Sequence, residues 1–216
     1  MMTNLLSSSV ARLRFLLVML VTLTVSANMW GETWTKVTSA PSDWSGEYLI
    51  VYEAGKVAFN GALTTLDAAS NTISVTISDG TITTTDAEAS FTIAKYSSSY
   101  TIKSASGYYI GRTSNNNGLE SSTSTSYENT ISLNDDGSVN LVSGEAYLRY
   151  NATSSISNGS QTGLRFRYYK SSSYTNQKAI CLYKKGSTET TVYLIPKCGG
   201  DGGGTWLVVI EWFATF

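Results

Sequence analysis

Few residue types in this chain could do chemistry, because its 216 residues include no histidine. This excludes Ser-His and Cys-His catalysis and every metal site built on imidazole. Chemistry with carboxylates alone, as in glycoside hydrolysis, needs two acids at a defined separation and one raised pKa. The candidate acids are scattered and fall mostly near turns: Asp43, Glu47, Glu53, Asp67 and Glu88. We therefore expect a protein that is not an enzyme and that has no cofactor.

The segment Asn134-Asp135-Asp136-Gly137 could suggest a calcium site. A calcium loop, however, needs further oxygen ligands at regular spacing and a distal glutamate, which do not follow here. Asn, Asp and Gly are also the residues that hairpin turns prefer. We interpret the segment as a turn and expect no metal site.

The aromatic residues favour a sugar-binding function. An aromatic ring stacks on a pyranose, while Asn, Asp or Arg side chains hold the sugar hydroxyls. The alternative is that alternate aromatic residues simply fill the core. The predicted ligand-binding residues are Asn60 next to Phe59, Tyr109 with Arg112, Tyr150 with Asn151, and Trp44 in a loop next to Asp43.

The clearest structural element is a β-hairpin over residues 99–112. Tyr100 and Ile102 alternate with polar neighbours, residues 103–107 form a small polar turn, and a second strand starts at Tyr108. A short alternating strand precedes this hairpin. The same order recurs around strands that start at Tyr48 and Ser138, so the three units are spaced about 40–50 residues apart.

Three degenerate repeats with about four short strands each predict an all-β, β-trefoil-like fold over residues 33–186. In that architecture paired hairpins close a barrel and leave no open strand edges. A β-sandwich is the alternative, because short strands at regular spacing are typical of it as well.

Residues 1–27 have the features of a signal peptide. Arg12 and Arg14 precede an apolar stretch over residues 15–25, and Val25-Ser26-Ala27 offers small residues for cleavage. The stretch is shorter than the roughly 20 residues that span a bilayer. We expect a secreted or cell-surface protein with no membrane span in the mature chain. The net charge of −1 and the lack of a basic block exclude a dedicated nucleic-acid binder.

The chain changes character after residue 186. Residues 187–198 are expected to form an extra strand or tail, and residues 199–204 a glycine-rich linker. Residues 205–216 form an apolar stub that either packs back as a strand or begins a second, truncated domain. Cys181 lies inside the last strand of the module and Cys198 just before the linker. Export permits a disulfide between them, and two unpaired thiols are the alternative.

Several phrases together resemble a known module. They are Gly-Glu-Tyr-Leu-Ile-Val-Tyr-Glu at 46–53, Ala-Phe-Asn-Gly at 58–61, Tyr-Thr-Ile-Lys-Ser-Ala-Ser-Gly-Tyr-Tyr-Ile-Gly at 100–111, Leu-Arg-Tyr-Asn at 148–151, Phe-Arg-Tyr-Tyr-Lys at 166–170 and Leu-Tyr-Lys-Lys at 182–185. The module is similar to one found in secreted, multidomain proteins of Gram-negative gut bacteria, often beside nuclease, protease or adhesin-like regions. The resemblance covers about residues 33–198. It implies export and an accessory role rather than an activity.

These observations lead to one main functional hypothesis and two alternatives. The main one is an exported, non-catalytic, monomeric module that binds carbohydrate or the cell envelope weakly at several similar sites, which together give avidity. The alternatives are a module that binds or inhibits a protein partner, and a structural spacer between other domains.

Overall fold

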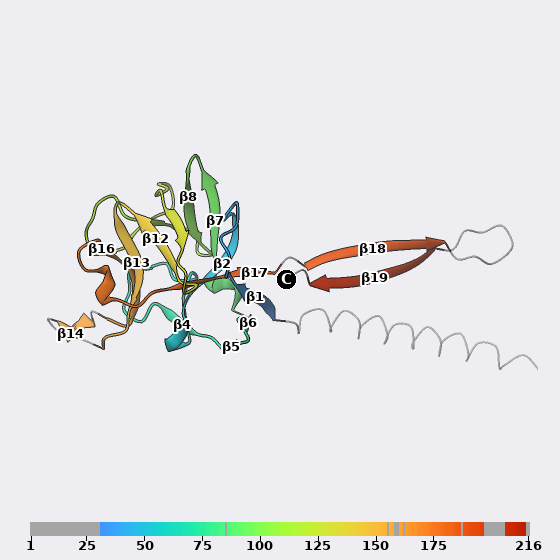
Figure 1. Cartoon of the computed structure of the whole chain (residues 1–216), viewed down its shortest axis with the longest axis horizontal. Coiled ribbons are helices and arrows are strands. Elements are labelled where there is room, and N and C mark those ends of the chain that lie inside the picture. The colour runs from blue at the N-terminus through green and yellow to red at the C-terminus, as the bar shows by residue number, and fades with distance from the viewer. Residues whose placement is uncertain are drawn as a thin grey trace, which may run out of the picture. The chain divides into compact units, whose positions relative to one another are not determined.

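Strands are the main regular structure of the described residues (Figure 1), which confirms the all-β prediction. The computed structural model describes residues 31–84, 86–154, 156–157, 160–161, 163–186, 188–196 and 206–214. Two compact units, Met1–Glu32 and Thr33–Phe216, make up the chain. The predicted signal peptide, residues 1–27, lies outside the described residues. Within the described ranges, no helix has the length and hydropathy to cross a membrane.

The described residues contain short strands joined by turns and three single-turn 3-10 helices. The strands are β1 (Glu32–Lys36), β2 (Gly46–Tyr52), β3 (Val57–Phe59), β4 (Thr72–Ser74), β5 (Ile77–Ser78), β6 (Thr81–Thr84), β7 (Phe91–Tyr96), β8 (Ser99–Ser104), β9 (Tyr109–Gly111), β10 (Glu120–Ser122), β11 (Thr130–Leu133), β12 (Val139–Ser143), β13 (Ala146–Asn151), β14 (Ile156–Ser157), β15 (Ser160–Gln161), β16 (Arg165–Lys170), β17 (Cys181–Lys185), β18 (Thr188–Pro196) and β19 (Trp206–Ala214). The helices are η1 (Glu53–Gly55), η2 (Ala87–Ala89) and η3 (Tyr174–Asn176).

Most strands belong to two sheets. The larger sheet has the order β10-β9-β8-β7-β2-β17-β1-β6-β5, with β3 on β2 and β4 on β3. The second has the order β11-β12-β13-β16, while β14–β15 and β18–β19 form separate two-stranded sheets. β17 lies between β1 and β2, and it runs antiparallel to both. The larger sheet therefore joins the beginning of the module to its end.

β2 is the strand around which the core is organised. Its residues 48–51 are completely buried on both faces of the sheet. Tyr48 and Ile50 belong to the larger core cluster, and Leu49 and Val51 to a smaller one. A strand that is buried on both faces reads as a continuous apolar run, which explains the sequence Tyr-Leu-Ile-Val.

The hairpin predicted over residues 99–112 forms as β8 and β9. Ile102 is completely buried, and Tyr100 packs against the larger core cluster. In the turn, the backbone N–H of Ser104 donates to the carbonyl of Tyr108 at 2.8 Å. Gly107 has a φ of +91°, which a glycine adopts without steric cost.

The last two strands form their own hairpin. β18 and β19 pair from Thr188↔Ala214 to Pro196↔Trp206. The segment expected to be an extra strand and the apolar stub are therefore antiparallel partners. The glycine-rich residues 199–204 belong to the segment that joins them, and this segment, with Cys198, lies outside the described residues.

Candidate functional site

The strand pair β13–β16 turns two chemically different faces away from each other. The two strands pair over six residues, from Ala146↔Lys170 to Asn151↔Arg165. Because side chains alternate along a strand, every second residue enters the core. The core-facing residues are Leu148, Tyr150, Phe166 and Tyr168. The opposite face, called the arginine face below, consists of Tyr147, Arg149, Asn151, Arg165, Arg167 and Tyr169.

Arg149 lies at the centre of the arginine face and is only 4% exposed. Its Nη1 donates to the carbonyls of Val139 and Leu148, each at 3.1 Å, and its Nη2 donates to Oδ1 of Asn140. All of these acceptors are neutral. Burial lowers the pKa of Arg149, yet a guanidinium stays charged at neutral pH. Among the described residues, no carboxylate forms an ion pair with it, and the charge of Asp136 opposes only part of the effect of burial on its pKa. The charge of Arg149 therefore favours an anion nearby.

Two tyrosine rings lie beside Arg149. Tyr147 of β13 and Tyr174 of η3 stack with ring centres 3.9 Å apart and planes 10° apart. The guanidinium carbon of Arg149 lies 5.0 Å from the ring centre of Tyr174 and 5.6 Å from that of Tyr147. Both rings are partly exposed. The result is an aromatic platform held by a fixed cation.

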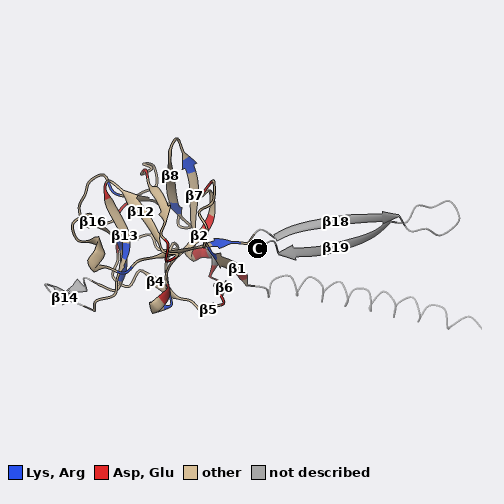
Figure 2. Ribbon diagram, viewed as in Figure 1, with Lys and Arg blue, Asp and Glu red and all other residues tan. Residues whose placement is uncertain are grey.

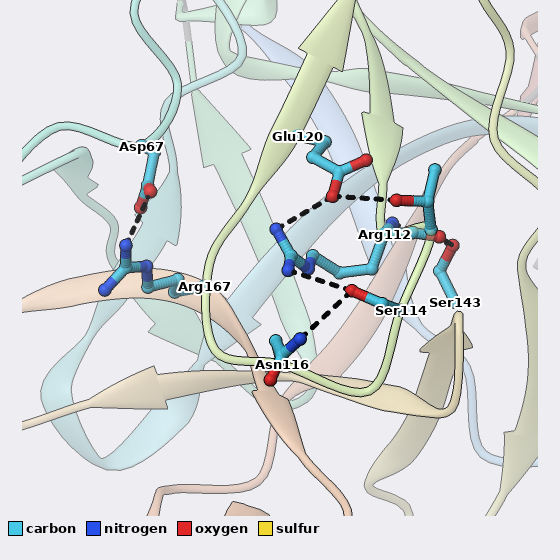
Figure 3. A network of polar contacts seen from close by, with 8 residues as sticks. Asp67, Arg112, Ser114, Asn116, Glu120, Ser143 and Arg167 are labelled. Carbon is cyan, nitrogen blue, oxygen red and sulfur yellow. Dashed lines mark hydrogen bonds and ion pairs between the residues drawn. The ribbon is translucent and has the colours of Figure 1, made fainter.

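Two further arginines meet at a single carboxylate. Arg167 Nη2 donates to Oδ2 of Asp67 at 2.9 Å, as Figure 3 shows. Arg165 Nη1 donates to the backbone carbonyl of Asp67 at 3.2 Å and lies 3.8 Å from its Oδ1. Tyr169, next to them, forms a hydrogen bond with Asn151, and burial raises the pKa of its hydroxyl. Asp67 therefore carries one negative charge between two guanidinium groups.

The sequence around this face is unusually short of acids. Residues 146–188 contain seven of the 15 Lys and Arg residues and none of the 16 Asp and Glu residues. Figure 2 shows Arg in blue on β13. Lys170 and Lys178 are exposed at the ends of neighbouring segments. The total charge of the chain is thus near neutral, although residues 146–188 are strongly basic.

The predicted residue Tyr150 is not a surface ligand. It is 6% exposed and lies in the core, where its ring stacks on Tyr52 with centres 4.9 Å apart. The prediction placed Tyr150 on the outward face of its strand, but the outward face consists of its neighbours Arg149 and Asn151. Asn151 does lie on the arginine face, and its Oδ1 accepts the N–H of Thr153 at 2.9 Å.

Trp44 is also buried, at 5% exposure, and so offers no face for a sugar ring. It belongs to the larger core cluster. Its backbone N–H donates to the Tyr100 hydroxyl at 3.3 Å. The loop that was predicted to hold a stacking platform instead uses its tryptophan to pack against the core strands.

Arg112 holds a loop together, as Figure 3 shows. Its Nη1 lies 2.9 Å from Oε1 of Glu120, and its Nη2 donates to Ser114 Oγ at 3.5 Å. Its backbone N–H donates to Ser143 Oγ at 3.0 Å. Its predicted partner Tyr109 is partly exposed and lies under the Lys103 ammonium, 5.0 Å from the ring centre. The structure therefore places the two side chains with different partners.

Asn60 has a local role. Its Oδ1 accepts the N–H of Ala62 at 3.1 Å, which is a turn-forming contact. The residue also borders an open hollow of about 400 Å³, which Asp86 and Glu88 line as well. Phe59, its predicted stacking partner, is completely buried.

Cys181 is a buried free thiol next to a polar cluster. Burial raises its pKa to about 11. Glu53 accepts hydrogen bonds from Lys36 Nζ at 2.9 Å and from the Tyr183 hydroxyl at 2.6 Å. The disulfide expected with Cys198 concerns a residue outside the described ones.

The segment 134–137 forms the turn between β11 and β12. Asp136 Oδ1 accepts the N–H and the hydroxyl of Ser138, at 2.9 and 2.6 Å, and these bonds lower the pKa of the Asp136 carboxyl. Within the part of the chain that the structure describes, no group of three acidic or cysteine side chains could hold a metal ion.

The prediction missed Tyr147, Arg149, Arg167 and Tyr174. Two features of the sequence could have indicated them. In Leu-Arg-Tyr-Asn and Phe-Arg-Tyr-Tyr-Lys, the outward face consists of the residues next to those that were chosen, and the stretch from 146 to 188 contains no acid. η3 could not be placed over β13 from the sequence, because that contact depends on the tertiary fold. Neither the known protein-family models nor the curated proteins include a match to this chain.

Proposed function

We propose that the chain is an exported, non-catalytic module that binds carbohydrate at the arginine face. The observation that carries the proposal is the stacked Tyr147–Tyr174 pair beside the fixed cation of Arg149. Rigid, partly exposed tyrosine rings provide an apolar surface for a pyranose ring. The neighbouring guanidinium and amide groups provide donors and acceptors for its hydroxyls.

We propose further that the fold is a β-trefoil, and the pairing of six strands supports this. Ladders join β17 to β2, β2 to β7, β7 to β8, and β11 to β12. The bridge Tyr100↔Asn129 links β8 to the residue before β11. The bridge Val139↔Ile180 links β12 to the residue before β17. We propose that these contacts close the six strands into a ring.

The remaining pairs fit three hairpins on this ring. They are β3–β4, β9–β10 and β13–β16. The three repeats then begin at β2, β8 and β12, one strand later than the sequence suggested. β17 is the last strand of the third repeat in this proposal. β1 pairs with β17 but is not one of the six strands of the ring. The arginine face belongs to the third hairpin, and the first two hairpins lack its cluster of arginine and tyrosine.

The carboxyl groups support a non-catalytic role. A glycosidase acid needs a raised pKa. The pKa of Asp43 is lowered by hydrogen bonds from Ser45, and that of Asp136 by hydrogen bonds from Ser138. Around Glu53, burial opposes ionisation, but the hydrogen bonds from Lys36 and Tyr183 outweigh it and lower the pKa.

The location we propose is the cell surface or the medium, on the basis of residues 1–27 and the resemblance described above. The module would act as a monomer that brings an attached partner to a glycan. Outside residues 155–162 and 187–216, Tyr96 is the only exposed large hydrophobic residue among the described ones, at 50%. This part of the chain therefore offers little apolar surface for docking a protein partner.

A glycan-array screen of the purified chain tests the proposal, with Tyr174→Ala as the variant and Tyr96→Ala as the control. Both substitutions remove an accessible tyrosine ring, but only Tyr174 belongs to the aromatic platform. We expect binding that Tyr96→Ala keeps and Tyr174→Ala loses. Binding that survives Tyr174→Ala would move the site elsewhere. Failure to bind any glycan would overturn the proposal and favour a protein partner or a spacer.

A further inference from the structure

We propose that the glycan bound at the arginine face is anionic, and specifically that it carries carboxylates, as uronic-acid polysaccharides do. The inference rests on the proposed function and adds the chemical class of the ligand. Three observations carry it: the buried charge of Arg149, which forms no ion pair, the exposed Arg167 beside a carboxylate that two arginines share, and the distribution of acids along the chain.

Arg149 is a pre-positioned cation. Its hydrogen bonds to two carbonyls and one amide oxygen fix the guanidinium before any ligand arrives. These neutral acceptors satisfy its donors without cancelling its charge. A ligand carboxylate on the tyrosine platform would lie within a few ångströms of this charge, where low exposure to water strengthens the attraction. A neutral sugar would gain no such energy.

Arg167 offers a second point of contact for an anion. It is 31% exposed at its side chain, so a ligand can reach it. Its Nε is buried, so a ligand can approach only the exposed end of the guanidinium. Its Nη2 donates to Asp67, and the same carboxylate lies 3.8 Å from Arg165. The two guanidinium groups together carry one more positive charge than Asp67 neutralises, which favours an anion at this end of the face.

Long-range charge favours the same ligand. The 43 residues from 146 to 188 hold seven cations and no acid, whereas the other 173 residues hold eight cations and all 16 acids. The exposed Lys170 and Lys178 extend the positive field beyond the arginine face. Such a field attracts a polyanion, while the acidic remainder of the chain repels it from other surfaces. This repulsion leaves the arginine face as the preferred surface for a polyanion.

Carboxylates fit the site better than other anions because of where a sugar carries them. The tyrosine platform offers a surface for the apolar face of a pyranose ring, and a uronic acid carries its carboxylate directly on that ring. A nucleic acid would need a longer basic groove along its backbone than three arginines supply.

The test is calorimetric titration of the full chain with oligomers of three acidic glycans, namely galacturonate, alginate and hyaluronan. Each is paired with its carboxyl-reduced form, which has the same ring and linkage but no charge. We expect at least one acidic oligomer to bind at least tenfold more tightly than its reduced partner. We also expect this binding to weaken as salt is raised from low to high concentration.

Matched arginine variants locate the site. Arg167→Gln removes a cation of the arginine face, and Arg112→Gln removes one that also pairs with a single carboxylate at 2.9 Å but lies outside the face. We expect Arg167→Gln to weaken binding of the acidic oligomer at least fivefold and Arg112→Gln to leave it unchanged. Thermal melting followed by circular dichroism shows that each variant is folded. Arg149 is left intact because its burial makes misfolding a risk.

The failures of the two proposals are distinguishable. If reduced and acidic oligomers bind equally, or if neutral glycans bind in a Tyr174-dependent way and acidic ones do not, the proposed function stands and the anionic inference is wrong. If no glycan of either kind binds, both fail together.

Discussion

Asn129 uses its entire side-chain amide inside the protein. It is completely buried, its Nδ2 donates to the carbonyls of Ile110 and Tyr127, and its Oδ1 accepts the hydroxyl of Tyr168 at 2.6 Å. Its backbone also pairs with Tyr100. A buried polar group is tolerated only when its partners are present. Asn129 therefore fixes the relative position of strands that are far apart in the sequence.

Tyr168→Phe should destabilise the protein. Removal of the hydroxyl leaves Asn129 Oδ1 buried without a donor, which costs about 1–3 kcal/mol. The measurement is urea unfolding followed by fluorescence. Tyr96→Phe removes a hydroxyl from an exposed ring and should change the free energy of unfolding by less than about 0.5 kcal/mol. Equal effects of the two substitutions would contradict this assignment.

The cluster of Lys36, Glu53 and Tyr183 makes stability depend on pH. The pKa of Glu53 is lower in the folded chain than its ordinary value of 4.5. Its contribution to stability is therefore present above about pH 4.5 and is lost as the pH falls through the folded value. Glu53→Gln should lower stability at pH 7 and reduce the slope of stability against pH in the acid range. Denaturant titrations between pH 3 and pH 7 measure both effects.

Part of the acid sensitivity should remain in this variant, because the lowered pKa values of Asp43 and Asp136 have the same sign. Lys36 acts in the other direction. Burial opposes its charge, but the hydrogen bond and the charge of Glu53 raise its pKa. Its contribution is lost as the pH rises through the folded value. An unchanged acid slope in Glu53→Gln would show that the pair is not linked to folding.

Cys181 should resist alkylation in the native chain. Its pKa of about 11 keeps the thiol protonated at pH 8, and its burial blocks access. Iodoacetamide treatment followed by mass spectrometry of the Cys181 peptide should show little labelling before unfolding and complete labelling in urea. Rapid labelling of the folded chain would mean that β17 opens readily.

At the residue scale, the sequence predicted the local turn at residues 134–137 but not the exposure of single side chains. The turn chemistry of residues 134–137 was interpreted correctly, because Asp and Gly act through local hydrogen bonds. The positions of Trp44 and Tyr150 were not, because their burial depends on partners such as Tyr100 and Tyr52 that lie far away in the chain. Sequence periodicity gives two faces of a strand but not which one is the core.

At the scale of elements, the turn between β12 and β13 is held in a narrow space. Gly144 has a φ of +53°, and a Cβ there would lie 2.6 Å from the backbone nitrogen of Ser114. Gly107, in the turn between β8 and β9, has a φ of +91°, but a Cβ there would have no other atom within 4 Å. The two glycines share the backbone requirement and differ in the space around them.

Gly144→Ala should therefore be more damaging than Gly107→Ala. Gly107→Ala is expected to cost about 1–2 kcal/mol for the left-handed backbone alone. Gly144→Ala adds a clash with the loop of Arg112, which costs about a further 1–3 kcal/mol. Thermal unfolding of both variants checks the order. The reverse order would show that the Ser114 loop yields easily.

Short-range elements were predictable, and long-range pairing was not. The hairpin turns at Gly80, Gly107 and Gly144 are marked by glycines that adopt positive φ, so local signals placed them well. β10 went unnoticed because Glu120–Ser122 has no apolar alternation. The insertion of β17 between β1 and β2 has no local signal at all, since it depends on closure of the whole sheet.

At the scale of the whole molecule, β17 connects the ends of the module. It pairs with β2 through four residues and with β1 through three. A chain that ends after Gly186 should unfold at the same urea concentration as the full chain, because it keeps β17, whereas β18 pairs with β19. A chain that ends after Lys178 should show no cooperative transition. Cooperative unfolding of the shorter chain would show that β17 is dispensable.

The all-β class followed from composition and from the repeated hairpins. In the ring of six strands that we propose, the repeats begin one strand later than the sequence pattern indicates, because β1 resembles β7 and β11 in its alternating sequence but lies outside the ring. Charge was misleading at this scale for a similar reason. A net charge of −1 averages over a basic segment and an acidic remainder.

The position of β17 also determines when during synthesis the larger sheet can be completed. Tyr183 bonds to Glu53 across 130 residues of chain, so the sheet cannot be completed while the ribosome is still adding the later residues. Until then β2 has one open edge and an exposed apolar run. A chain whose larger sheet is incomplete is still unfolded in part, and a protein-conducting channel transports unfolded chains. For the exported protein that we propose, late closure would allow the chain to leave the cytoplasm before it folds.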